Sequence, residues 1–495
     1  MTKAKLLILV ALGFSLLTYL RQFDLTQAWL NFEVSKNPSI SFSKAGFSPK
    51  KIVVREGTEV GFINESEEGF WPASNIHPLN DLYPEFDPKK PLAKGNKWLF
   101  RFEKVGEWGY HDHLNPNFSG TVIVIGKRLF NKKDTSCQDP ASLTYNQRQV
   151  CWYFEMKDII QKEGLTSAFA RLLELFEKEP AFASGCHDVT HLIGDAAYRE
   201  FEKGKAFIFR EETSWCGYGF YHGFIESLLW AKGDLKEAQK FCESINQNLT
   251  SAIKSPNAIY SCYHGMGHST FDAHDPRLWG NEIKMLTPAI TLCEKVREGL
   301  EEEKSKQCAT GVFNALANAY SNNQYGLKLN EKDPVWICRD YASQYKKACF
   351  AEVAVAWVST TMGGRGFDFL KAARFIEGLK DKEGEEMAIF ALSSEYARQR
   401  RDNLVFKDMV ENCHLVKGEL RPFCIQGVVV GLMGWTRPGE EYIAILDFCR
   451  TETLSQEEKN ACLGYFLPRV GTLYSLDKTA SICQAVEEEY RGICR

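Results

Sequence analysis

The chain has 495 residues, of which 44% are hydrophobic and 25% are charged, and its formal net charge is −4. A globular chain of this length is expected to form two or three domains. The slightly negative charge and the lack of a basic tract argue against a nucleic-acid-binding protein, which is usually basic.

Residues 1–23 have the pattern of a signal segment. Two lysines precede an apolar run from Leu6 to Leu20, which Arg21 closes. No small-residue cleavage site follows, which favours an uncleaved membrane anchor over a cleaved signal peptide. Because the lysines are expected to stay in the cytoplasm, the rest of the chain would be exported and would lie in the periplasm or at the cell surface.

Residues 38–127 show the alternation of apolar and polar side chains that is typical of β-strands. The pattern runs through SISFSKAGFSPKKIVVREGTEVGFINES, KWLFRFEKVGEWGYHDH and TVIVIG, with turn residues between the runs. We therefore expect a small antiparallel β-sandwich. The charged segment that follows, KRLFNKKDT at 128–136, is predicted to be a linker.

Three histidines of this β region are candidate metal ligands. His77 lies in FWPASNIHP, and His111 and His113 lie in GEWGYHDHLNPNFSG. Imidazole ligands suit copper(II), zinc(II) or iron. Residues 1–136 contain no cysteine and residues 2–155 contain no methionine, so soft sulfur ligands are excluded from this region.

The same stretches resemble the cupredoxins, the plastocyanin-like copper proteins. FSPKKIVVREGTEVGFIN is similar to their early strands, and GEWGYHDHLNPNFSGTVIV resembles their ligand loop, with the spacing from Tyr110 to Gly120. The resemblance covers residues 38–126, under a fifth of the chain. It implies a cupredoxin-like fold with copper as the first choice of metal and zinc or iron as alternatives.

The ligand residues depart from the cupredoxin pattern. Asp112, Asn115 and Phe118 stand where the family has its cysteine, its second histidine and its methionine. Only His77 matches a family ligand. A blue-copper site needs two histidines and a cysteine, so this type of copper site is excluded.

The direction of the side chains leaves two arrangements open. Alternate residues of a strand point to opposite faces, so His111 and His113 point away from the side that Asp112 occupies. Either His77 joins Asp112, or the strand ends early and the loop turns His111 and His113 towards His77. We prefer the second, because three imidazoles make a better metal site than one. The alternative without a metal is a decayed cupredoxin whose histidines only form hydrogen bonds.

From residue 137 onward the periodicity is helical. TSAFARLLELFEKE, DLKEAQKFCESINQNL and PAITLCEKVREGLEEE space apolar residues as helices do, and similar segments recur at steps near 40. Two helices per step are typical of an all-α helical-repeat domain, here 137–495. The sequence leaves open whether the repeats form an open solenoid or a closed toroid.

All 16 cysteines lie in this region, at short recurring spacings. Such a pattern indicates disulfides in an oxidising compartment, and no CxxC knuckle for a zinc–thiolate site occurs. The simplest scheme pairs them in order, each clipping one helix to the next: 137/151, 186/216, 242/262, 293/308, 338/349, 413/424, 449/462 and 483/494. One unit lacks its cysteines and has Ile376 and Met387 instead.

The early helical units carry a second set of candidate metal ligands. His187 with His191, His222 with Glu226, and His264 with His268 are spaced i,i+4, which places each pair on one helix face. Glycines beside them (Gly223, Gly265, Gly267) would let helices or ligands approach closely. The later units carry residues such as Asn314, Val355, Val430 and Leu467 at matching positions.

These observations predict an exported, membrane-anchored metal-binding protein with a modified cupredoxin domain, for copper handling or redox chemistry. A second metal would lie in the helical domain; the alternatives there are histidines that only bond across packed helices, or a pH-sensitive partner site. One other function is a helical-repeat scaffold that binds a protein partner. Another is a metal-dependent enzyme that uses the helical histidines with Glu226, Asp188 or Asp272.

Overall fold

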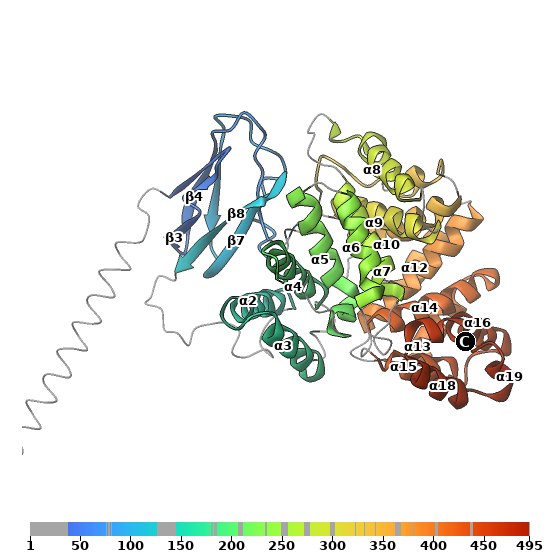
Figure 1. Cartoon of the computed structure of the whole chain (residues 1–495). Coiled ribbons are helices and arrows are strands. Elements are labelled where there is room, and N and C mark those ends of the chain that lie inside the picture. The colour runs from blue at the N-terminus through green and yellow to red at the C-terminus, as the bar shows by residue number, and fades with distance from the viewer. Residues whose placement is uncertain are drawn as a thin grey trace, which may run out of the picture. The chain divides into compact units, whose positions relative to one another are not determined.

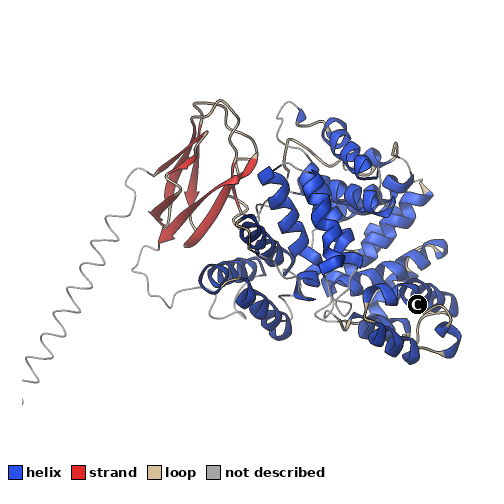
Figure 2. Ribbon diagram, viewed as in Figure 1, coloured by secondary structure: helices blue, strands red, loops and turns tan. Residues whose placement is uncertain are grey.

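The computed structural model divides the chain into two compact units, Met1–Gln138 and Asp139–Arg495, here called the β unit and the helical unit (Figures 1 and 2). The expected anchor (1–23) and linker (128–136) lie outside the described residues. No helix in the described part of the chain is long and apolar enough to cross a membrane. The structure describes residues 38–75, 77, 80, 82–125, 145–179, 182, 186–205, 211–232, 235–248, 256–271, 278–297, 302–321, 323–330, 332–341, 343–361, 368–379, 381–400, 404–435 and 439–494.

The described part of the β unit forms two four-stranded sheets. Aromatic side chains pack between them: the Tyr110 ring centroid lies 4.8 Å from that of Phe47 and 5.4 Å from that of Phe62. The first sheet has the order β2 (Gly46–Ser48), β1 (Ser39–Ser43), β4 (Thr58–Asn64) and β6 (Lys97–Phe102). The second has the order β3 (Lys51–Arg55), β8 (Asn115–Ile125), β7 (Gly106–Asp112) and β5 (Pro72–Ser74).

The predicted sandwich is present, but it is not antiparallel throughout, because each sheet contains one parallel pair. β1 runs parallel to β4, and β3 runs parallel to β8. After the β1–β2 hairpin the chain enters the other sheet as β3 before it returns as β4. A parallel pair requires such a crossover, and the alternation of side chains along one strand does not reveal it.

The helical unit is a series of neighbouring helices, as the helical periodicity predicts. Each member of the main series contacts the next: α4 (Cys186–Glu202), α5 (Trp215–Lys232), α7 (Pro256–Thr270), α9 (Glu302–Ser321), α10 (Ser343–Thr361), α12 (Lys382–Arg400), α14 (Arg421–Trp435) and α16 (Gln456–Phe466). Among the described residues, five helices alternate with them: α6 (Leu235–Asn248), α8 (Glu282–Arg297), α11 (Phe369–Ile376), α13 (Phe406–His414) and α15 (Glu441–Cys449). The remaining ones lie at the two ends: α2 (Tyr145–Glu163), α3 (Leu165–Lys178), α17 (Val470–Leu473), α18 (Leu476–Ala485) and α19 (Glu488–Arg491).

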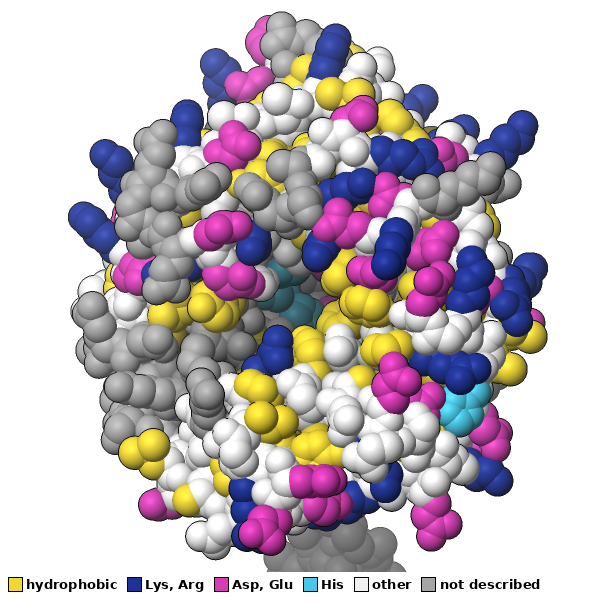
Figure 3. All heavy atoms as spheres, turned by 90° about the vertical axis from the view of Figure 1, so that its right-hand side faces the viewer, with side chains coloured by type: hydrophobic (Ala, Val, Ile, Leu, Met, Phe, Trp, Pro, Cys, Tyr) yellow, Lys and Arg dark blue, Asp and Glu magenta, His cyan; other side chains and the backbone are white. Residues whose placement is uncertain are grey.

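The series turns back on itself. α14 contacts α5, and α17 contacts α7, although these helices lie far apart in the sequence. An extended solenoid would not bring them together, because each repeat would contact only its neighbours. The space-filling view shows a hollow in the face of this unit with histidine side chains at its floor (Figure 3).

Disulfides join the successive helices of this unit. Seven of the eight predicted pairs are present: Cys186–Cys216, Cys242–Cys262, Cys293–Cys308, Cys338–Cys349, Cys413–Cys424, Cys449–Cys462 and Cys483–Cys494. The partner predicted for Cys151, at position 137, lies outside the described residues. In the unit without cysteines, Ile376 ends α11 and Met387 lies early in α12, so a helix pair fills this gap as predicted.

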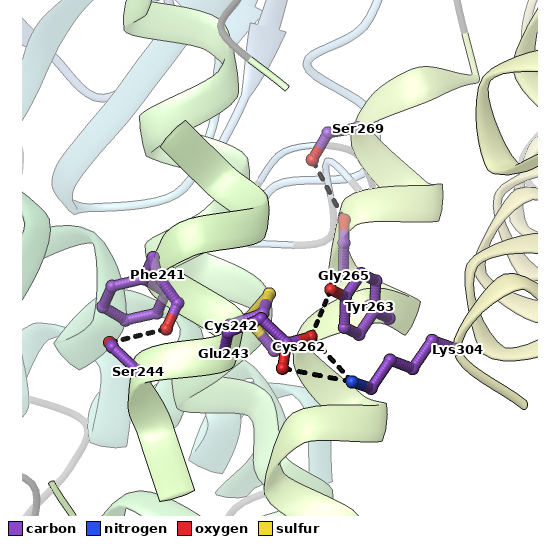
Figure 4. The surroundings of a disulfide bond; sticks show 9 residues. All are labelled: Phe241, Cys242, Glu243, Ser244, Cys262, Tyr263, Gly265, Ser269 and Lys304. Atoms are coloured by element: carbon purple, nitrogen blue, oxygen red, sulfur yellow. Dashed lines mark hydrogen bonds and ion pairs between the residues drawn. A yellow bond between two sulfur atoms is a disulfide. The ribbon is translucent and has the colours of Figure 1, made fainter. Parts of the chain in front are cut away.

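Polar contacts add to the disulfides around α7. Cys262 of α7 is bonded to Cys242 of α6. Next to this bond, the Glu243 carboxylate accepts hydrogen bonds from the Tyr263 hydroxyl at 2.7 Å and from Lys304 Nζ of α9 at 2.8 Å (Figure 4). These contacts join α6, α7 and α9 in the middle of α7, directly before His264.

Candidate metal centres

The β unit brings its three candidate histidines together. His111 belongs to β7, His113 follows that strand directly, and His77 follows β5. One ring nitrogen from each lies within 4.8 Å of the others. The ring centroid of His77 is 4.7 Å from that of His113 and 5.2 Å from that of His111. His111 and His113 are buried, and His77 is partly buried.

The end of β7 explains why the histidines rather than the aspartate form this cluster. The pairing with β8 shifts register between His111 and Asp112, as in a β-bulge. The Asp112 carboxylate accepts hydrogen bonds from the backbone N–H groups of Trp71 at 2.9 Å and Leu114 at 3.3 Å. Burial raises the pKa of Asp112 to about 7. The structure thus follows the second of the two arrangements, with His111 and His113 turned towards His77.

The hydrogen bond of His111 leaves its other ring nitrogen available to a cation. We assign the proton of His111 to Nδ1, which donates to Asn75 Oδ1 at 3.1 Å, so Nε2 presents its lone pair. Nε2 lies 3.4 Å from Nδ1 of His113. Metal–nitrogen bonds of about 2.0–2.1 Å place neighbouring ligand atoms of one ion about 3.0–3.4 Å apart. Burial lowers the pKa of His111 to about 3, which keeps the imidazole neutral, as a metal ligand must be.

The helical unit gathers five histidines from three successive helices. His187 and His191 lie on α4, His222 on α5, and His264 and His268 on α7. The two predicted histidine pairs meet, because their Nε2 atoms are 3.1 Å apart on α4 and 3.0 Å apart on α7. The first pair and His222 form a group whose ligand atoms lie within 4.8 Å of one another.

Glycines set the distance between these helices. A Cβ atom on Gly223 of α5 would lie 2.2 Å from the carbonyl oxygen of His191, and one on Gly265 of α7 would lie 2.9 Å from the Cα of His222. No larger residue fits at those distances. The sequence predicted that either a helix or a ligand approaches these two glycines. In the structure, the backbone of the neighbouring helix approaches each of them.

Burial sets the charge state of the helical cluster. It lowers the pKa of His187 and His264 to about 3 and that of His191 to about 4, so the imidazoles are neutral. It also raises the pKa of the Glu226 carboxyl well above its usual value. In the described part of the chain, the buried atoms His222 Nδ1, His268 Nδ1 and Glu226 Oε1 have no hydrogen-bond partner. Each such atom costs about 1–3 kcal/mol unless a cation or another group satisfies it.

Of the two other carboxylates proposed with these histidines, the structure describes Asp188. Asp188 accepts a hydrogen bond from Gln149 Nε2 at 3.2 Å. Asp272 lies outside the described residues.

A partly buried carboxyl group on α10 was missed by the sequence analysis. Glu352 of α10 faces Asn314 of α9, which donates to its carboxylate at 2.6 Å. Burial raises the pKa of Glu352 to about 7. A lone glutamate within the apolar run FAEVAVAW is the signal that could have revealed it.

Neither a protein-family model nor a curated protein matches the chain. Among solved structures, it is similar to a purple cupredoxin from Nitrosopumilus maritimus, at 19% identity over 18% of this chain and 99% of that chain, with a TM-score of 0.15. It is also similar to a copper-containing nitrite reductase from Thermus scotoductus, at 21% identity over 19% and 23% of the two chains, with a TM-score of 0.16. A mutant of amicyanin has 20% identity over 19% and 87%, with a TM-score of 0.16. At such values the likenesses say nothing about the chemistry of the histidines.

Proposed function

We propose that the chain is an exported metal-binding protein whose modified cupredoxin domain holds copper(II) on His77, His111 and His113. The observation that carries this proposal is the cluster itself, in which one nitrogen from each imidazole lies within 4.8 Å of the others. Among divalent first-row metals, copper(II) binds nitrogen ligands most tightly, and zinc(II) follows. The absence of cysteine from residues 1–136 separates this site from a blue-copper site.

Three protein ligands leave one coordination position for water or a small molecule. In zinc proteins this arrangement marks a site that acts on a bound molecule, whereas structural sites are closed by four protein ligands. Copper handling or slow redox chemistry suits such a site better than the rapid electron transfer that a thiolate ligand tunes.

The helical unit supports a second metal centre at His187, His191 and His222. Nδ1 of His187 lies 2.8 Å from the carbonyl oxygen of Cys216, which can only accept a hydrogen bond, so the ring proton is held there. Nε2 of His187 therefore presents a lone pair towards Nε2 of His191 at 3.1 Å. Metal-binding histidines are commonly oriented in this way, through a backbone carbonyl on the other ring nitrogen.

The disulfides support the exported location. Seven of them join helices of this chain, and such bonds persist in oxidising compartments. In this proposal, residues 1–23 anchor the protein in the membrane and the two units lie outside the cytoplasm.

Copper(II) titration of three chains tests the β-unit site. The parent chain is compared with His111→Ala plus His113→Ala and with Asp112→Asn, and bound copper is counted by elemental analysis after dialysis. We expect the double variant to lose one ion per chain. Asp112→Asn keeps an oxygen that can accept from the amides of Trp71 and Leu114, so this matched control should retain all the copper.

Two results would contradict the proposal. A parent chain that retains no stoichiometric metal would remove the proposed function altogether. Loss of the ion from Asp112→Asn, with the double histidine variant unaffected, would instead favour the site formed by His77 and the aspartate.

A further inference from the structure

We propose that the helical cluster holds two metal ions, one on His187, His191 and His222 and the other on His264 and His268. This inference rests on the proposed metal-binding function of the helical unit and deepens it. Each i,i+4 histidine pair supplies two ligands to one of the ions. The pairs lie on α4 and α7, and α5 contacts both of these helices.

The number of ligands exceeds what one ion takes. Five imidazoles from three helices converge here, whereas zinc sites usually have four ligands in total. The group of ligand atoms that lie within 4.8 Å of one another is made of His187, His191 and His222. His264 and His268 are therefore left over as a pair that the first ion does not use.

This second pair has the same geometry as the first. Its Nε2 atoms lie 3.0 Å apart, against 3.1 Å for the pair on α4. Both distances match the separation of about 3.0–3.4 Å expected for two nitrogens bound to one ion. In addition, Nδ1 of His268 is buried and has no hydrogen-bond partner among the described residues.

His222 lies within reach of both pairs. Its ring centroid is 5.1 Å from that of His187 and 5.1 Å from that of His264, and 5.6 Å from that of His268. Its Nδ1 is buried without a partner in the described part of the chain. His222 therefore lies between the two proposed ion positions, next to both histidine pairs.

Glu226 places a carboxyl group beside the histidine cluster. It lies one helical turn after His222 and is only 3% exposed. Its Oε2 lies 3.5 Å from Nδ1 of His191, and its Oε1 has no hydrogen-bond partner among the described residues. Carboxyl oxygens are common ligands of metal ions, so this oxygen is a further donor beside the imidazoles.

The next helix shows what a pair that needs no ion looks like. On α9, Asn318 Nδ2 donates to Asn314 Oδ1 at 3.0 Å, again at i,i+4. An amide pair satisfies itself in this way because each side chain has both a donor and an acceptor. Replacing His264 and His268 by asparagine therefore removes the imidazoles with side chains that a neighbouring helix already accommodates.

The test counts copper(II) ions in chains that lack the β-unit site through His111→Ala plus His113→Ala. In this background we expect two ions per chain, and one ion after His264→Asn plus His268→Asn. The ion that remains also reports that the helical unit is folded. His414→Ala is the matched control, since His414 lies on α13 and pairs with Glu458 at 3.0 Å; it should leave both ions bound.

The other outcomes overturn the inference in distinguishable ways. One ion before the asparagine substitutions means that the helical unit has a single centre, and the proposed function stands without this inference. No ion in the β-site-deficient background, with helical circular dichroism intact, removes the metal-binding role of the helical unit as well. Two ions that survive the asparagine substitutions, or the loss of both, mean that His264 and His268 do not hold an ion of their own.

Discussion

The two units gather imidazoles by opposite means. In the β unit, an irregular backbone brings the histidines together. A register shift occurs at the end of β7, and backbone amides bind the Asp112 carboxylate. In the helical unit, regular backbone does so: histidines repeat at i,i+4, and glycines let successive helices approach. The comparison teaches that a helical site depends on how the helices pack, whereas the β site depends on a few local hydrogen bonds.

Reduction of the disulfides should produce the largest difference in stability between the two units. By chain-entropy reasoning each disulfide contributes about 3 kcal/mol to the free energy of unfolding, which is only about 5–15 kcal/mol for a typical domain. Thiol reduction in mild denaturant should therefore unfold the helical unit, while the β unit keeps its fold because residues 1–136 have no cysteine. Far-ultraviolet circular dichroism follows the helices, and limited proteolysis with mass spectrometry follows the β unit. Simultaneous unfolding of both would contradict the independence of the two units.

Gly223→Ala should damage only the helical centre. The new Cβ would lie 2.2 Å from the carbonyl oxygen of His191, so α4 and α5 must move apart. We expect a loss of about 3 kcal/mol in the free energy of unfolding of the helical unit and weaker metal binding there. The matched control is Gly464→Ala on α16, where a Cβ meets nothing within 4 Å, and which should be neutral or stabilising by up to about 1 kcal/mol. Equal effects of the two substitutions in denaturant titrations would remove the packing explanation.

The unit without a disulfide should accept one. Ile376 and Met387 are eleven residues apart, which is the separation of Cys338–Cys349 and Cys413–Cys424. Ile376→Cys plus Met387→Cys should form a bond and raise the free energy of unfolding by about 2 kcal/mol. Mass spectrometry after thiol alkylation checks the bond, and free thiols at both positions would show that this repeat differs from its neighbours.

Glu352→Gln should produce the smallest effect, and one that depends on pH. The folded-state pKa of about 7 lies above the ordinary value of 4.5, so the native carboxyl stays protonated at a pH at which the unfolded chain already ionises. Its contribution is therefore fully present below about pH 4.5 and is lost as the pH rises to about 7. Because the side chain is partly exposed, we expect the glutamine variant to gain roughly 1–2 kcal/mol over the parent at pH 8 and little at pH 4. Denaturant titrations at both values measure this, and a pH-independent difference would contradict it.

Helical regularity explains why much of the second centre could be predicted. His187 and His191 share a face in any α-helix, and so do His264 and His268, so spacing alone predicts each pair. The disulfides were predicted differently, by pairing the cysteines in order along the chain. Spacing could not predict the register between neighbouring helices, and this register brings Glu352 of α10 to Asn314 of α9.

In the β unit, less could be predicted. Strand alternation indicates a sandwich but not its parallel pairs, because those depend on the path between the sheets. The resemblance to cupredoxins identified the segment with His111 and His113 as a ligand loop. The direction of these two side chains depends on the register shift after His111, which no residue pattern encodes on its own.

X-ray absorption at the copper edge of the copper-loaded chain tests the central claim, that both units bind metal through imidazole nitrogens, most directly. We expect a first shell of nitrogen and oxygen atoms at about 2.0 Å with the outer-shell scattering of imidazole rings, lost in part when His111 and His113 are replaced and in part when His187 and His191 are replaced. A sulfur shell at about 2.3 Å, or a first shell without imidazole scattering, would contradict it.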